Sequence, residues 1–242
     1  MHKLITIFKR EFFGYFRSPV AYVFLIVFLV ASVGLTWFLG GFFDTDDASL
    51  TRFFMFQPWI FLFLIPAVGM RLWSEEKKSG TWELLFTLPV SIPEAVFGKF
   101  LAGWAFISLA ISLTFTMPLT VAYLGNPDWG PILSGYAGCM LMAGAFLSIC
   151  SFTSALTKNQ VISFVLSVII CLVLVFLGWS VFNDLLIAAS LPVWLIDALS
   201  NFSFITHFDG MTKGLVTARD LIFFVSLTLF CLFANILTLE RK

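Results

Sequence analysis

Few side chains in this sequence could carry out acid–base, nucleophilic or metal chemistry. There are two histidines, His2 and His207, and the four cysteines lie inside apolar runs without partners at metal-ligand spacing. The G-x-x-x-x-G-K-[ST] phosphate loop is missing, and Gly98-Lys99-Phe100 has neither the upstream glycine nor the Ser/Thr of that motif. The sequence therefore predicts no catalytic, cofactor or metal site, and it excludes ATP hydrolysis by the P-loop route.

The polar residues between 183 and 220 leave one enzymatic alternative open. Asp184, Asp197, His207 and Asp209 could serve a membrane-embedded enzyme that acts on lipid, although their spacing matches no recognisable motif. A membrane scaffold or sensor without transport is a further alternative. An adjacent gene for an ATPase would distinguish both from a transporter.

Composition indicates that lipid is the solvent of most of this chain. The 242 residues are 60% hydrophobic and only 12% charged, and the mean hydropathy is +1.00. A soluble domain carries about 25% charged residues, so the charged side chains here are too few to cover a water-facing surface. We expect an all-α membrane protein that forms a single transmembrane domain over 1–242.

Six apolar runs are each long enough to cross the bilayer, which takes about 20 residues. Backbone groups in lipid must be satisfied within each segment, so these runs are predicted to be helices. The predicted spans are 20–43, 53–73, 100–124, 131–156, 161–182 and 221–239.

The distribution of positive charge predicts the orientation of these spans. Of the 14 Lys and Arg residues, only Arg52, Lys213 and Arg219 fall on the side opposite the termini, which leaves 14 − 3 = 11 on the side of the termini. Cytoplasmic segments carry the excess of Lys and Arg. Both termini are therefore predicted to be cytoplasmic, in the inner membrane of a bacterium, with Asp46, Asp128 and Asp209 outside.

Residues 3–17 combine an apolar face with basic residues, which is typical of a helix lying in the membrane interface. A simple basic anchor that sets topology is a compatible alternative. The interface-helix residues that we single out are Phe8, Arg10, Glu11, Phe12 and Phe16.

The loop 74–93 is the most charged part of the chain and is predicted to be cytoplasmic. Ser79-Gly80 indicates a turn, and Thr81 is a plausible N-cap for a short helix over 82–88. Apolar side chains on such a helix suit docking of a partner, although they could also pack back onto the protein's own helix ends. The predicted docking residues are Glu75, Glu76, Lys77, Thr81, Glu83, Leu84, Leu85 and Leu88.

The outer segment 183–220 is too long for a structureless loop. We expect two short helices, 185–189 and 193–204, in a re-entrant hairpin, because a seventh span would bury Asp197 in lipid at roughly 2.5–3.5 kcal/mol. The predicted gate residues are Asp197, Asn201, His207 and Asp209. Merely sealing the outer surface of a dimer is the alternative role.

Three stretches carry a family resemblance: IFKREFFGYFRSPVAY (7–22), RLWSEEKKSGTWELLFTLPVS (71–91) and HFDGMTKGLVTARDLIFF (207–224). Together they resemble the type-2 ABC transporter permeases, closest to the gliding-motility exporter branch. The resemblance implies six spans, a cytoplasmic interface helix, a coupling helix and an outer re-entrant hairpin. It also implies that two permease chains, identical or related, pair with two ATP-binding subunits that hold ATP and Mg. The substrate is not indicated by any charge within the spans.

Overall fold

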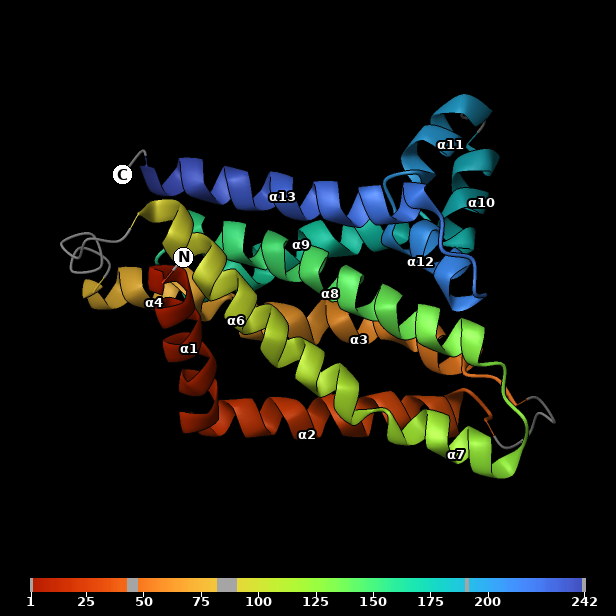
Figure 1. Ribbon diagram of the computed structural model, residues 1–242. Coiled ribbons are helices and arrows are strands. Elements are labelled where there is room, and N and C mark those ends of the chain that lie inside the picture. The colour runs from red at the N-terminus through yellow and green to blue at the C-terminus, as the bar shows by residue number, and fades with distance from the viewer. Residues whose placement is uncertain (1, 43–47, 82–90, 190–191, 241–242) are drawn as a thin grey trace.

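The computed structural model describes residues 2–42, 48–81, 91–189 and 192–240. The regular structure within these ranges is helical, and most of the long helices run along one common axis (Figure 1). The helices are α1 His2–Arg17, α2 Pro19–Gly34, the π-helix η1 Leu35–Leu39, α3 Thr51–Gly69, α4 Arg71–Ser79, α6 Ile92–Leu113, α7 Thr116–Leu124, α8 Trp129–Leu156, α9 Gln160–Phe176, α10 Ser180–Ala188, α11 Val193–Ser200, α12 Phe204–Thr212 and α13 Ala218–Glu240.

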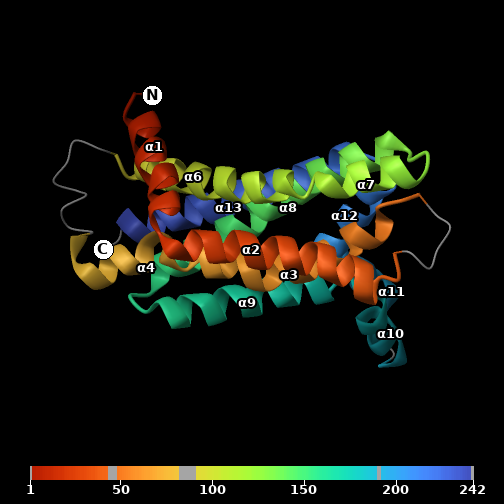
Figure 2. The same ribbon diagram turned by 90° about the horizontal axis from the view of Figure 1, so that it is seen from below.

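Five helical segments of the described chain are long and apolar enough to span a membrane, and the bent pair α9–α10 supplies a sixth if it counts as one span. The five are Pro19–Leu39, Thr51–Ser79, Ile92–Leu124, Trp129–Leu156 and Ala218–Glu240. α1, α4 and the last turn of α13 lie together at one end, which we call the α1 end (Figures 1 and 2). The opposite end, with α7 and α10 to α12, is called the α7 end.

α8 forms the centre of the bundle. In its most apolar stretch 78% of residues are buried, against 22% in α2 and in α13. Small residues allow this, because they let neighbouring backbones approach closely. A Cβ added at Gly69 of α3 would lie only 2.3 Å from the Cβ of Cys150 in α8. The two helices therefore pack so closely at Gly69 that there is no room for a side chain.

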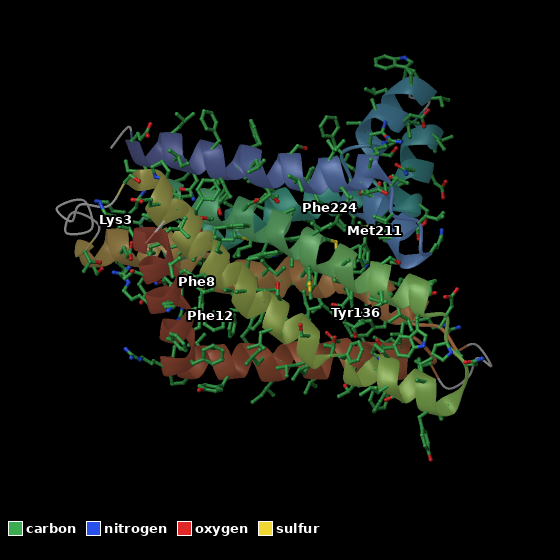
Figure 3. The ribbon with its side chains drawn as sticks, viewed as in Figure 1. Lys3, Phe8, Phe12, Tyr136, Met211 and Phe224 are labelled. Carbon is green, nitrogen blue, oxygen red and sulfur yellow. The ribbon has the colours of Figure 1, made fainter. Side chains whose placement is uncertain are left out.

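The helix of the third span begins before residue 100, where the sequence predicted its start, and it is interrupted near its end. α6 already starts at Ile92, where the Ser91 and Glu94 side chains form a capping box. The helix breaks after Leu113, because Pro118 has no N–H to donate to the carbonyl of Thr114. The Met117 N–H donates to that carbonyl instead, at 2.9 Å, and the phenol of Tyr136 in α8 (Figure 3) is a second donor at 3.0 Å.

The prediction for the fifth span, 161–182, is wrong at its outer end. α9 ends at Phe176, and α10 leaves it at an angle of 72°. Gly178 lies at the corner, where an added Cβ would meet the Ser203 hydroxyl oxygen at 2.2 Å. The close approach of the segment before α12 therefore turns the chain, and hydrophobicity alone gave no sign of it.

Two other boundaries also differ from the expectation. Two short helices were expected in the segment 183–220, but it contains part of α10 and then α11 and α12. The additional helix is α12, which begins after Ser203 because the Ser203 hydroxyl caps it by accepting from the Ile205 N–H. Residues 71–79 continue α3 as the helix α4, which ends at Gly80 in the left-handed conformation (φ 73°). The predicted helix over 82–88 lies outside the described residues.

Candidate functional site

The α3–α4 junction is fixed to α8 by buried hydrogen bonds. The backbone N–H groups of Trp73 and Ser74 both donate to the Ser154 hydroxyl at 3.0 Å. That hydroxyl donates in turn to the Met70 carbonyl at 2.8 Å. One serine thus satisfies backbone groups on both sides of the junction, so α4 is held rigidly against α8.

A second serine extends this connection to α13. The Ser151 hydroxyl accepts from the indole N–H of Trp73 at 3.2 Å and from the Asn235 amide at 2.7 Å. Lys77, a predicted docking residue, is buried and donates to the carbonyl of Ala155 at the C-terminal end of α8, where a positive charge is stabilised. The helices α4, α8 and α13 therefore form one connected unit at the α1 end.

Lys99 of α6 lies at the centre of the charged residues at this end. Its side chain is only 3% exposed, and its ammonium lies 2.6 Å from the Glu76 carboxylate and 3.7 Å from that of Glu11. It also donates to the Leu72 carbonyl at 3.1 Å and lies 5.0 Å from the Trp73 ring centroid. A single cation thus joins α1, α4 and α6.

α1 is seated on α6 by close apolar contacts. A Cβ at Gly98 would lie 2.8 Å from the Ile7 side chain, and the Tyr15 ring stacks on Phe106 at 4.8 Å. Phe8 and Phe12 stack along α1 at 5.7 Å (Figure 3). Burial, with a further contribution from Glu11, raises the pKa of the Tyr15 phenol well above its ordinary value, so this hydroxyl keeps its proton.

The structure places the predicted docking residues in two environments. Glu76 pairs with Lys99, and Lys77 is buried against the end of α8. Glu75 and Thr81 are exposed. Glu83, Leu84, Leu85 and Leu88 lie outside the described residues. Among the interface-helix residues, Glu11 bonds both Arg10, at 2.6 Å, and the Lys99 group, while Phe12 and Phe16 pack against the core.

The predicted gate residues at the α7 end are only partly brought together. His207 is buried; its Nδ1 lies 2.7 Å from the Asp220 carboxylate, and its Nε2 lies 2.9 Å from the Asn201 carbonyl. A carbonyl only accepts, so Nε2 carries a proton. Asp197 is exposed, and Asp209 pairs with Lys213 on the surface. His207 thus fastens α12 to the end of α11 and to α13.

Sequence reasoning missed Lys99 as a site residue, and with it Ser151, Ser154, Asn235 and Asp220. Lys99 carried a usable signal, since it is a single charge at the edge of a long apolar run, where ionisable residues are rare and usually paired. The serines carried none, because hydroxyls that join helices look the same in sequence as hydroxyls that bond within their own helix.

Comparison with known proteins identifies the family of the chain. No curated relative matches the sequence. The profile of a family described as "ABC-2 family transporter protein" matches residues 7–178, a range that contains most of α1, the α3–α4 junction, Lys99 and the whole of α8. The match covers well over half of the 242 residues; this chain belongs to the ABC-2 family of transporter proteins.

Proposed function

We propose that this chain is the permease subunit of an ATP-driven exporter in a bacterial inner membrane, in the gliding-motility-exporter-like branch of the family. A separate subunit binds ATP and Mg and hydrolyses the nucleotide. The observation that carries the proposal is the Lys99 group, because it ties the amphipathic helix α1 to α4 and α6 at the end of the bundle where α4 ends and α6 begins (Figure 1).

Motion of the ATP-binding subunit enters the bundle through this end. The subunit presses on the 74–93 segment and on α1 as it closes on ATP. α4 cannot yield separately, because Ser151 and Ser154 fasten its junction to α8 and α13. The motion of the ATP-binding subunit is therefore transmitted to the transmembrane helices as a joint movement of α4, α8 and α13.

Two permease chains, identical or related, complete the transporter. The first, second and fifth spans (α2, α3 and α9) form the dimer centre; they lie on one side of the bundle (Figure 2), and α2 and α9 expose apolar side chains such as Ile26, Val30 and Ile169. At the far end Asp197, Asn201, His207 and Asp209 belong to a segment that gates release outside.

The docking prediction is tested on Leu84 and Leu85. Changing both to Asp places charge on an apolar docking surface, so co-purification of the ATP-binding subunit should fall by about tenfold or more, the loss that about 1.4 kcal/mol produces. Pull-down from detergent extracts measures it. The matched controls are the double change to Met, which keeps the surface apolar, and Lys78→Ala, on an exposed position. Undiminished co-purification by the Asp pair, in protein with normal thermal stability, contradicts docking at these leucines.

The orientation is tested by labelling single cysteines in a background without the four native ones. A cysteine at Lys78 should react only after the inner membrane is opened, whereas cysteines at Asp128 and Asp209 should react with an impermeant reagent in intact cells. The physical reason is the excess of Lys and Arg at the α1 end. Labelling of position 78 from outside would refute the orientation.

A further inference from the structure

A cavity of about 380 Å³ lies at the α1 end between α1, α2, α3, α4 and α6. Ala21, Phe24, Val68 and Phe106 make one side of it apolar, whereas carboxylates and cations of α1, α4 and α6 line the other. Its position is where α1 turns away from the axis of the bundle (Figure 2). An amphipathic helix of this kind marks the depth of lipid headgroups.

Two opposite charges in the lining have no ion-pair partner among the described residues. Arg71 and Glu75 stand one turn apart on α4 and both line the cavity, yet neither forms a salt bridge with any described residue. The Nε of Arg71 is buried without a hydrogen-bond partner in the described part of the chain. Leaving a buried donor unpaired is costly, so this guanidinium calls for an acceptor from outside the chain.

The charges that line the cavity discriminate between ligands. The carboxylates are those of Glu11, Glu75 and Glu76 and the cations are Arg71 and Lys99, so the formal balance is 2 − 3 = −1. Lys99 pairs with one Glu76 oxygen at 2.6 Å, while the other, Oε2, is buried without a hydrogen-bond partner among the described residues, and Glu11 pairs with Arg10 at 2.6 Å. What remains is one guanidinium for an anion and, a helical turn away, one carboxylate for a cation. A purely anionic headgroup could bind the guanidinium but has no cation for the carboxylate.

We propose that this cavity binds a zwitterionic phospholipid whose headgroup carries a primary ammonium, as phosphatidylethanolamine does. The phosphate accepts from the Arg71 guanidinium, which suits phosphate geometry. The ammonium donates to Glu75, and the first part of an acyl chain lies against Phe24 and Val68. The bound lipid braces the corner between α1 and α2 against α4. The proposal concerns this chain alone and does not depend on transport.

Native mass spectrometry of the purified, delipidated full chain tests the site. Lipids of matched acyl chains are added one class at a time. Phosphatidylethanolamine should be retained about tenfold better than phosphatidylcholine, whose quaternary nitrogen has no N–H to donate, and better than phosphatidylglycerol, whose headgroup carries no ammonium for Glu75. Arg71→Gln and Glu75→Gln should each abolish that preference, whereas Lys78→Gln, a charge lost from the same helix outside the cavity, should leave it unchanged.

The outcomes separate cleanly. Glu75 is exposed, so Glu75→Gln reports on the site even if Arg71→Gln folds poorly, and thermal unfolding of each variant shows which has happened. Equal retention of all three lipids, or an unchanged preference in Glu75→Gln, overturns the proposal. Free phosphoethanolamine that displaces the lipid at equal concentration also overturns it, since the apolar wall would then contribute nothing. Because no ATP-binding subunit takes part, failure here leaves the permease proposal untouched.

Discussion

Lys99→Met should lower the free energy of unfolding by about 3 kcal/mol, near the lower end for removing one partner of a buried ion pair. The change leaves the Glu76 and Glu11 carboxylates, only 21% and 24% exposed, without the cation that they share. Chemical unfolding in mixed micelles measures it. Lys158→Met, which removes a lysine from an exposed position, is the matched control and should change stability by less than about 0.5 kcal/mol.

A second variant separates charge from packing. Lys99→Met combined with Glu76→Gln removes both charges of the 2.6 Å pair, so the double variant should recover part of the lost stability. If the double variant is as unstable as the sum of the two single ones, Lys99 contributes through packing, and the electrostatic link between α1, α4 and α6 is refuted.

Gly69→Ala should cost about 2 kcal/mol by overpacking, although Ala is the better helix former. The added methyl would lie 2.3 Å from the Cβ of Cys150, and both atoms are attached directly to backbone, so only a separation of α3 from α8 can make room. Thermal unfolding of the purified chain measures the loss.

The chain offers matched tests of this close contact. Gly34→Ala, in α2, meets nothing within 4 Å and should be neutral or stabilising by up to about 1 kcal/mol. Cys150→Gly combined with Gly69→Ala moves the methyl to the other helix and should restore much of the stability. An unaltered melting temperature for Gly69→Ala alone would show that α3 and α8 are not in contact here.

The helical class and the membrane-length segments could be predicted because a long apolar run has few physical outcomes. At roughly 1.5 Å per residue, segments such as 131–156 can cross the bilayer only as helices. The breaks could not be predicted in the same way. Ser203 lies against Gly178 so closely that no Cβ fits at the corner, and Tyr136 adds a second donor to the Thr114 carbonyl at the break in the third span; both contacts join residues distant in sequence.

The charged residues show the same division between local and distant causes. Glu11 was selected as part of the predicted interface helix and Glu76 as part of the charged loop 74–93, and two predicted spans separate them. Nothing in their spacing indicates that both meet Lys99, since that depends on how α1 folds back over α6. Lys77 was expected at a docking surface because charged residues usually face water, but the end of α8 supplies it with a carbonyl acceptor.

The 72° corner after α9 has a consequence for the surrounding bilayer. α9 has 17 residues, about 26 Å at roughly 1.5 Å per residue, whereas α8 has 28 residues, about 42 Å. A hydrocarbon layer of roughly 30 Å is thicker than the first and thinner than the second. α9 alone therefore stops short of one bilayer surface, and at the proposed dimer centre the apolar layer beyond its α7 end is left for α10 and the second permease chain to fill, not for lipid.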